Sequence, residues 1–389
     1  MNFGFKLNTN IFCGEQCSLG IAEKLLSFGF KCPGLIIDEG VSSAAGVKAL
    51  LKVISESELQ QKFILESRST EEPDYDYLDE CAKYVKKYDV DCLVGIGGGS
   101  TMDLTKGVAV LMTNTGKGVD YRGMDKVVNA SLPTVLLPTT AGTGSEVTFT
   151  AAFVDKKEKR KLGINGKHVS AYAAFLDPEL TSTCPAHVAV GSGADALVHA
   201  LEAFMTTGNN SIIFSIAVES IVMIMRNFEF AVNQKHNSLA RLNMLVASYL
   251  AGITLMYSGG GISGALSYPL GAEYGVPHGL AGGIFIPDII VQNIQRGYYG
   301  YSLLNDRLSP AESCLSEKDR SLSFLNKVKD LCESINMPID LSFFSVTRKD
   351  IEHIVESTIK ERKAVLDNNP VVADENFLKT ILEMRIVKE

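Results

Sequence analysis

Several features that are scarce in this sequence exclude classes of protein. The eight cysteines are scattered, and only Cys13 and Cys17 lie close together, so no second pair stands at the spacing of a zinc ribbon. We expect reduced thiols, packed as small apolar groups in a cytosolic protein. Acidic residues outnumber basic ones by 45 to 37, for a net charge of −8. A nucleic-acid binder usually carries a net basic face, so that class is disfavoured.

Long apolar runs are also scarce. The longest spans residues 245–257 and is interrupted by Ser248, Gly252 and Thr254. It falls short of the roughly 20 residues that cross a bilayer, so we predict a buried helix there. The first twelve residues contain one lysine and no apolar core, so we expect no signal peptide. These features predict a soluble, cytoplasmic protein without membrane or nucleic-acid partners.

The order of the predicted elements indicates two domains. The chain has 389 residues and 46% hydrophobic residues, which suits a globular protein of two domains or of one large domain. In the first half, short apolar runs alternate with helical patterns, which favours a parallel sheet covered by helices on both faces. We predict strands at 33–38, 62–66, 92–96, 134–137, 148–154 and 171–176, and helices at 44–56, 74–88 and 102–112.

The pattern changes after Asp177 and Pro178, where strand-like runs nearly vanish. We place a domain boundary near Pro185, with an α/β dinucleotide-binding domain over 1–184 and an all-helical metal and substrate domain over 185–389. Helical spacing there predicts helices at 193–205, 212–232, 239–257, 279–292, 322–335 and 349–361.

A glycine-rich turn, Gly97-Gly98-Gly99-Ser100, follows a predicted strand and opens a helix. Glycines in such a turn let backbone N–H groups approach a phosphate, and the helix N-terminus favours an anion. A tight strand–helix connection needs glycine as well, so a purely structural role stays open. A second loop over 138–146 alternates hydroxyls and glycines and also follows a strand. Both loops should lie at the carboxyl edge of the sheet, where open α/β sheets bind ligands.

An acidic residue that binds the adenosine ribose would be expected about 20 residues after the turn. Asp120 stands there but lies in a polar stretch, whereas Asp38 ends the first predicted strand. A carboxylate at Asp38 can accept hydrogen bonds from the ribose and would repel a 2′-phosphate. A simple turn role for Asp38 stays open.

A possible metal site begins with Asp195 and His199, which stand four residues apart and share one face of a predicted helix. A plain surface pair is the alternative, but the apolar neighbours of both residues indicate a buried helix. His278 stands in a Gly/Pro-rich turn of the same domain, so three potential ligands would leave open positions for a substrate oxygen.

Taken together, these motifs resemble the iron-containing (group III) alcohol dehydrogenase family, whose relatives include glycerol dehydrogenase and dehydroquinate synthase. The resembling segments run in family order over most of the chain: GGGSTMDLTK (97–106), PTTAGTGSEVT (138–148), KLGI (161–164), FLDPEL (175–180), GADALVHALEAF (193–204) and YPLGAEYGVPHG (268–279).

The resemblance implies a cleft between the two domains, NAD, a divalent metal such as Fe or Zn, and a homodimer. It implies NAD rather than NADP because of the acid at Asp38. It places the cofactor pyrophosphate at Gly97, Gly98, Gly99, Ser100 and Asp103. It also implies a phosphate and nicotinamide side lined by Thr139, Thr140 and Thr143, an approach of Lys161 to the nicotinamide ribose, and metal ligands Asp195, His199 and His278.

Two positions depart from the family motif, which reads His-x-x-x-His-Pro-Leu-Gly. Gly264 replaces the first histidine, a metal ligand, and Tyr268 replaces the second, which lines the active site. We therefore expect a metal that is weakly held or absent. Tyr268, with Lys161 assisting, is the candidate for polarising the substrate oxygen. A motif with tyrosine at this second position also resembles the sugar-acid branch that includes 3-deoxy-octulosonate 8-oxidase, although that branch keeps the first histidine.

Three classes of function follow from the resemblance. The first is an NAD-dependent oxidoreductase that interconverts an alcohol and an aldehyde or ketone. Small residues around 259–264 suggest a roomy pocket that suits a polyol or sugar derivative. The second is a lyase or cyclase of the dehydroquinate synthase type, and the third is a family member with altered or lost catalysis, which Gly264 motivates.

Overall fold

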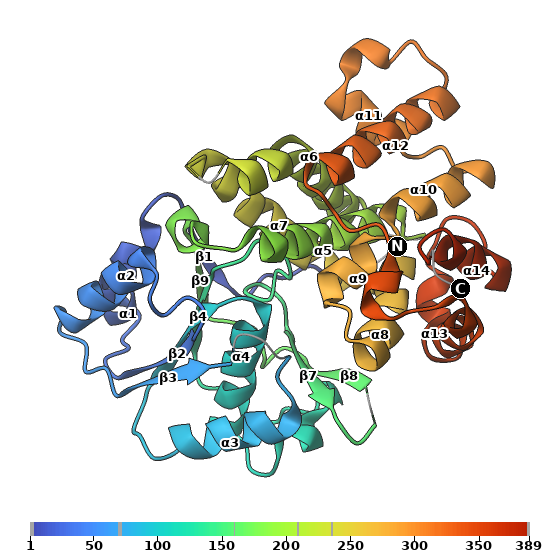
Figure 1. The fold of residues 1–389 in the computed structure, drawn as a ribbon. Coiled ribbons are helices and arrows are strands. Elements are labelled where there is room, and N and C mark those ends of the chain that lie inside the picture. The colour runs from blue at the N-terminus through green and yellow to red at the C-terminus, as the bar shows by residue number, and fades with distance from the viewer. Residues whose placement is uncertain (1–3, 69–71, 159, 208–209, 235, 387–389) are drawn as a thin grey trace. The chain divides into compact units, whose positions relative to one another are not determined.

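The computed structural model describes residues 4–68, 72–158, 160–207, 210–234 and 236–386 (Figure 1). The chain divides into two compact units, Asn2–Pro185 and Ala186–Glu389.

The first unit is built on a six-stranded sheet whose pairs are all parallel. Its spatial order is β1-β9-β6-β4-β2-β3. The chain runs from β2 outward to β3 and then returns to place β4 on the other side of β2, so the strand order reverses between β2 and β4. The strands are β1 (Asn10–Cys13), β2 (Pro33–Asp38), β3 (Phe63–Ser67), β4 (Cys92–Gly97), β6 (Thr134–Pro138) and β9 (Ala173–Leu176).

Helices cover both faces of this sheet, as Figure 1 shows. On β2, Leu35 and Ile37 belong to one buried cluster with α1 (Ile21–Ser27) and α2 (Ala45–Ser55). Ile36 points to the other face and belongs to a cluster with α3 (Tyr75–Val85) and α4 (Gly99–Thr113). Burial of both faces explains why the strands read as continuous apolar runs.

A smaller sheet of three strands has the order β5-β8-β7. It contains β5 (Gly123–Met124), β7 (Thr150–Asp155) and β8 (Arg160–Asn165), and β7 pairs with β8 in antiparallel fashion. The strand predicted at 148–154 therefore lies outside the large sheet. The KLGI segment falls on β8, which no strand prediction covered because it begins with two basic residues and contains a glycine.

All regular elements in the described part of the second unit are helical. Its α-helices are α5 (Ala186–Met205), α6 (Ser211–Asn233), α7 (Ser238–Ser258), α8 (Ile262–Tyr274), α9 (His278–Gly283), α10 (Ile286–Gln295), α11 (Ser302–Leu308), α12 (Glu317–Ser334), α13 (Ile351–Leu366) and α14 (Glu375–Glu383). Short 3-10 helices also occur in both units: η1 (Cys17–Gly20), η2 (Gly118–Tyr121), η3 (Pro178–Thr181), η4 (Pro310–Glu312), η5 (Leu341–Phe344) and η6 (Arg348–Asp350).

The single helix predicted over 279–292 is wrong, since α9 and α10 are separate helices. Pro287 stands in the first turn of α10, where its missing N–H costs nothing, and thereby marks a new start. The helices α8, α11 and α14 were not predicted. In α8 the internal Pro269 hides the helical signal.

The prediction that the longest apolar segment is too short to cross a membrane is wrong. By length and composition alone, α5, α6 and α7 are each long and apolar enough to cross a membrane. The interrupted run at 245–257 lies within α7, which extends it to 21 residues. The share of the most apolar stretch that is buried within the chain is 78% in α5, 44% in α6 and 56% in α7. The three helices pack against one another.

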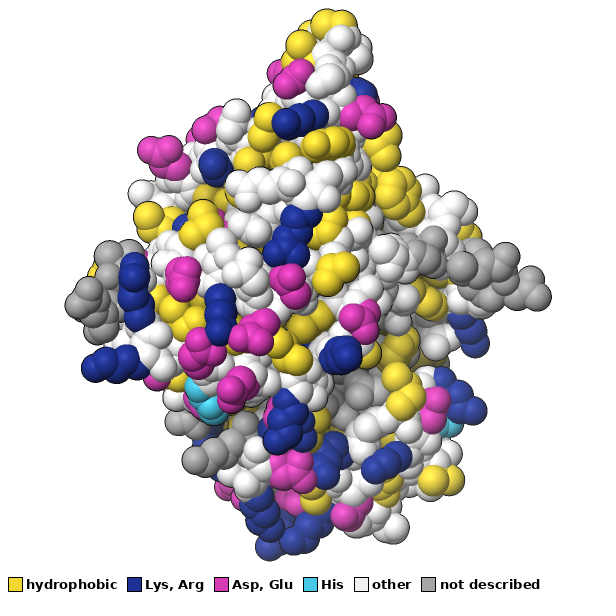
Figure 2. Space-filling model, turned by 90° about the vertical axis from the view of Figure 1, so that its right-hand side faces the viewer, with side chains coloured by type: hydrophobic (Ala, Val, Ile, Leu, Met, Phe, Trp, Pro, Cys, Tyr) yellow, Lys and Arg dark blue, Asp and Glu magenta, His cyan; other side chains and the backbone are white. Residues whose placement is uncertain are grey.

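Charges of both signs are interspersed on the face drawn in Figure 2. Lysine and arginine side chains there alternate with aspartate and glutamate. This face therefore lacks, over its described residues, the one-sided basic field expected of a nucleic-acid interface.

Candidate functional site

The carboxyl ends of β2 and β4 meet where the strand order reverses. Asp38 ends β2 and Gly97 ends β4, and these two strands are hydrogen-bonded neighbours. A methyl group placed on Gly97 would lie 2.9 Å from Cβ of Asp38. The reversal point of an open parallel sheet is where such folds bind ligands. The structure thus brings the glycine turn and the predicted ribose-binding acid together.

Asp38 is half-buried and fixed by its own loop. Its Oδ1 accepts a hydrogen bond from the backbone N–H of Gly40 at 2.8 Å. Burial raises the pKa of this carboxyl, and the Gly40 hydrogen bond opposes that rise. Asp120, by contrast, accepts from the N–H of Lys117 within a local turn at 2.8 Å.

The glycine turn packs directly on the second loop. The N–H of Thr139 donates to the carbonyl of Gly97 at 2.9 Å. A side chain on Gly99 would collide with Thr143, at 2.6 Å from its Cγ2. A side chain on Gly98 would come within 3.4 Å of Oγ1 of Thr140, an ordinary van der Waals contact.

The three glycines therefore have different reasons to be glycine. Gly97 and Gly99 lack room for any side chain, whereas Gly98 lies at the N-cap of α4 with extended backbone that any residue adopts. An open Gly98 suits the close approach of a phosphate to the backbone. Ser100 is half-buried in the first turn of the same helix.

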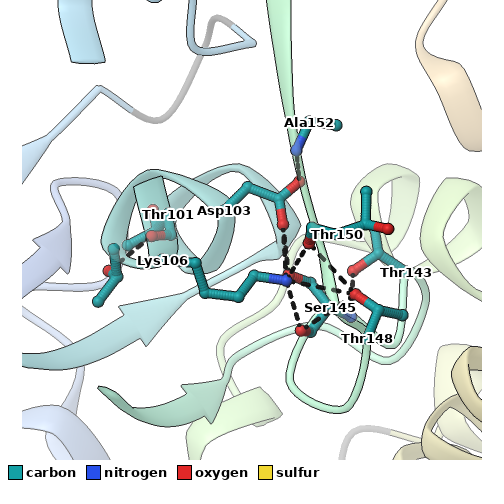
Figure 3. A network of polar contacts seen from close by, with 9 residues as sticks. Thr101, Asp103, Lys106, Thr143, Ser145, Thr148, Thr150 and Ala152 are labelled. Carbon is teal, nitrogen blue, oxygen red and sulfur yellow. Dashed lines mark hydrogen bonds and ion pairs between the residues drawn. The ribbon is translucent and has the colours of Figure 1, made fainter. Parts of the chain in front are cut away.

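A buried polar network anchors the second loop to α4 (Figure 3). Lys106 is fully buried and donates to the carbonyl oxygens of Ser145, at 2.8 Å, and Thr150. Asp103, one turn earlier, lies 3.2 Å from the Lys106 ammonium. Its Oδ1 accepts from Oγ of Ser145 at 2.5 Å, and its Oδ2 accepts from the N–H of Ala152 at 3.0 Å.

These contacts give Asp103 a task within the chain. Both of its oxygens are engaged by the loop and by β7, so it positions the loop that carries Thr139, Thr140 and Thr143. Its expected place at the pyrophosphate stays a prediction. Our sequence reasoning missed Lys106, although an Asp-x-x-Lys pair inside an otherwise uncharged helix is a usable signal.

The network lies in a strongly desolvated place. Burial lowers the pKa of Lys106, and the neighbouring Asp103 opposes that change. Burial also raises the pKa of Glu146, in the same loop, to about 7, with Lys106 pulling it back. Burial thus shifts the pKa of each group in the direction of its neutral form.

Lys161 lies on β8 and forms an ion pair with Glu72, at 2.6 Å between Nζ and Oε1. Both side chains are partly exposed, so the pair adds little stability. The predicted role of Lys161 beside the nicotinamide ribose stays a prediction.

In the helical unit, the three predicted metal ligands gather around one carboxylate oxygen. Oδ1 of Asp195 lies 3.6 Å from Nε2 of His199 and 3.9 Å from Nε2 of His278. Asp195 and His199 lie on α5, and His278 begins α9, which packs on α5. Nδ1 of His199 is buried without a hydrogen-bond partner in the described chain.

This arrangement is incomplete as a metal centre. Across the described residues, no group of three or more His, Cys, Asp or Glu side chains has the geometry of a metal site. At Gly264, where the family has its further histidine, a carboxylate is the nearest group. The N–H of Gly264 donates to Oε1 of Glu202 at 2.8 Å.

Glu202 is therefore a buried cap for the first turn of α8. Burial raises its pKa to about 7. Backbone N–H groups at the start of α8 lower this pKa, and the nearby Asp195 raises it. A side chain on Gly264 would lie 3.3 Å from Oε2 of Glu202. Our sequence analysis missed this role because the two residues are far apart along the chain.

Tyr268 lies between a histidine and an arginine. Its ring meets that of His278 edge to face, with centroids 5.7 Å apart. The guanidinium carbon of Arg362, on α13, stands 3.8 Å from the centre of the Tyr268 ring. Nothing in the sequence around Arg362 pointed to it, because it lies outside every motif.

A parallel sheet with a glycine turn and a carboxylate at its reversal point, joined to a helical unit with a partial Asp-His-His cluster, defines a dinucleotide-dependent oxidoreductase. Residues 8–178 match the iron-containing alcohol dehydrogenase family, and residues 189–386 match the C-terminal part of the Fe-containing alcohol dehydrogenase family. The chain belongs to this family.

Individual relatives agree with that assignment. The chain is 30% identical to a sulfoacetaldehyde reductase from Bilophila wadsworthia (strain 3_1_6), over 90% of each chain. It superposes on the crystal structure of a 1,3-propanediol oxidoreductase with a TM-score of 0.90 and 26% identity, over 98% of this chain and 99% of that one. It also matches sulfoacetaldehyde reductase from Bifidobacterium kashiwanohense in complex with NAD+, with a TM-score of 0.88, 26% identity and full coverage of both chains.

Of the three classes of function left open by the sequence, the comparisons support the first. The protein is an NAD-dependent alcohol dehydrogenase of the iron-containing group, which interconverts an alcohol and an aldehyde or ketone. The narrower resemblance to the sugar-acid branch stays a prediction.

Proposed function

We propose that the protein acts on a small polar substrate, a polyol or sugar derivative, with NAD(H) preferred over NADP(H). The observation that carries the cofactor assignment is the juxtaposition of Asp38 and the glycine turn at the reversal point of the sheet. A carboxylate there accepts hydrogen bonds from a ribose and repels a 2′-phosphate. Two of the relatives, named 1,3-propanediol oxidoreductase and sulfoacetaldehyde reductase, are named for small molecules that carry a second polar group.

A divalent ion would be held by Asp195, His199 and His278. The carboxylate and two imidazoles suit Fe²⁺ or Zn²⁺, and Nδ1 of the buried His199 has no hydrogen-bond partner among the described residues. The missing fourth ligand at Gly264 makes this site weak. Such an ion, when bound, supplies Lewis-acid polarisation of the substrate oxygen.

The chain's own groups bind and orient the substrate. The Tyr268 hydroxyl can donate a hydrogen bond to a carbonyl oxygen, and its ring is held between His278 and Arg362. The first unit holds the cofactor through the backbone at Gly98 and the loop that Lys106 anchors. The cytoplasmic location and the homodimer stay predictions.

The test is a cofactor titration joined to a substrate panel. Binding of NADH and NADPH is measured by nucleotide fluorescence, and oxidation of polyols and reduction of aldehydes are followed at the nicotinamide absorbance. Gly98→Val should abolish NADH binding while the protein stays folded, because the new side chain fills the space that the pyrophosphate needs.

Gly20→Val is the matched control, since a side chain on Gly20 would meet nothing within 4 Å. Unchanged NADH affinity in Gly98→Val would move the phosphate site away from this turn. A wild-type protein that binds NADH but turns over no alcohol or aldehyde would refute the proposed substrate class.

A further inference from the structure

Arg362, in the helical unit, has no anionic partner among the described residues. Over the described residues, Arg362 forms no hydrogen bond or salt bridge, and its Nε is buried without any hydrogen-bond acceptor. Most arginines of this unit donate to a carboxylate or a backbone carbonyl: Arg226, Arg296, Arg307, Arg320 and Arg385.

The guanidinium of Arg362 is placed by an aromatic ring instead. Its Cζ lies 3.8 Å from the centre of the Tyr268 ring. The Tyr268 ring in turn contacts the ring of His278, and His278 lies beside Asp195. All four residues belong to the second unit, on α5, α8, α9 and α13, and α8 packs against both α9 and α13. A positive charge thus lies beside the groups assigned to the substrate oxygen.

The backbone of α13 breaks its helical geometry at this residue. Arg362 has φ −129° and ψ 17°, whereas its helix continues on both sides. A kink in a helix needs a cause, and neither proline nor glycine occurs within α13. Non-helical backbone at a single residue changes the direction of its side chain, which here ends on the Tyr268 ring.

A half-buried guanidinium with a buried, unpartnered N–H is costly unless an acceptor completes it. Its five donors form a planar fork that matches a carboxylate or sulfonate in bidentate fashion. Stacking on Tyr268 holds the fork in one orientation without using any of these donors.

We propose that Arg362 binds an acidic group, a carboxylate or a sulfonate, on the substrate whose hydroxyl or carbonyl meets Tyr268 and His278. This inference rests on the proposed function, and among its small polar substrates it selects short hydroxy acids and their aldehydes over neutral polyols. Arg362 then determines specificity through substrate binding, and Tyr268 is both its platform and the neighbour of the reacting oxygen.

The experiment compares alcohols that differ only in the acidic group. For the wild type, kcat and KM are measured with NAD+ for 3-hydroxypropanoate against 1,3-propanediol, and for 2-hydroxyethanesulfonate against ethane-1,2-diol. We expect the acidic member of at least one pair to have the higher kcat/KM, and the better pair distinguishes carboxylate from sulfonate.

Arg362→Gln should lower the ratio of acidic to neutral kcat/KM by about 10- to 100-fold, mostly through KM, because a charge-assisted bidentate contact is lost. Arg362→Lys should recover part of that ratio, since it keeps the charge but not the fork. Arg348→Gln makes the same charge change at an exposed residue of the same unit and should leave the ratio unchanged.

A binding measurement separates failure of the inference from failure of the proposed function. Calorimetric titration with propanoate and with ethanesulfonate needs no turnover. Binding by the wild type that weakens in Arg362→Gln supports the inference even if no alcohol is oxidised. No binding of either anion to the wild type, or equal binding by wild type, Arg362→Gln and Arg362→Lys, overturns it and leaves Arg362 a packing partner of Tyr268.

Discussion

At the scale of single residues, Asp38 should decide which dinucleotide is used. Asp38→Gly removes the carboxylate that would meet a 2′-phosphate, so we expect the ratio of kcat/KM for NAD+ over NADP+ to fall at least tenfold. Steady-state kinetics with both cofactors measure this ratio. Asp120→Asn is the control, because Asp120 stands at the sequence spacing of the ribose-binding acid but accepts a hydrogen bond from Lys117 within a local turn.

If Asp120→Asn changes the ratio of kcat/KM for NAD+ over NADP+ and Asp38→Gly does not, the placement of the ribose at Asp38 is wrong. A native preference for NADP(H) would contradict the assignment as well.

Residues within one motif could be predicted from the sequence, and residues that act across the chain could not. The pair Asp195 and His199 is visible because four residues make one helical turn. The cap that Glu202 forms on α8 and the stacking of Arg362 on Tyr268 join segments far apart in sequence, and no local pattern encodes such contacts. Lys106 lies between these cases, since its partner Asp103 is local but its carbonyl acceptors are not.

At the scale of elements, the loop after β6 should impose a pH dependence on stability. Glu146 has a pKa of about 7 when folded and about 4.5 when unfolded, so the folded state binds more protons between these values. The free energy of unfolding of the wild type should therefore decrease as pH rises through this window and level off above it. The glutamine side chain in Glu146→Gln has nearly the same shape as glutamate but does not titrate.

Thermal denaturation from pH 5 to pH 8 measures the effect. The stability of Glu146→Gln relative to wild type should increase with pH, by on the order of 3 kcal/mol in total. Glu80→Gln, an exposed change on α3, should follow the wild type. Parallel curves for wild type and Glu146→Gln would show that burial does not shift this carboxyl.

The start of α8 should control metal affinity. Gly264→His adds an imidazole where the family has a ligand, and we expect at least tenfold tighter Zn²⁺ binding by calorimetry. The new side chain must displace Glu202 by a few tenths of an ångström, since its Cβ would lie 3.3 Å from Oε2. Gly264→Ala has the same steric cost without the imidazole and serves as the matched control.

His199→Ala should weaken the ion in either background. Equal binding by wild type and His199→Ala would show that Asp195, His199 and His278 are not a metal site, and Tyr268 would then be the leading group for polarising the substrate oxygen.

Element types could be predicted more reliably than their limits. The strand β2 and the helix α2 follow from continuous apolar runs and from helical spacing. The division between α9 and α10 was missed because apolar residues continue through it, and β8 was missed because its pairing with β7 compensates for a polar sequence. Hairpin pairing stabilises strands whose own residues have weak strand propensity.

At the scale of the whole molecule, the two units should respond separately to their ligands. A ligand present at 100 times its Kd stabilises the state that binds it by about 2.7 kcal/mol. NAD+ should therefore slow hydrogen exchange at backbone amides of 98–106 and 139–148 in the first unit, where local opening exposes the glycine turn and its loop. Zn²⁺ should slow exchange in α5, α8 and α9 of the second unit, and Gly98→Val should lose only the NAD+ effect. If either ligand slows exchange throughout both units, the two units open as one cooperative body. If NAD+ slows exchange only in the second, helical unit, the cofactor does not bind at the sheet.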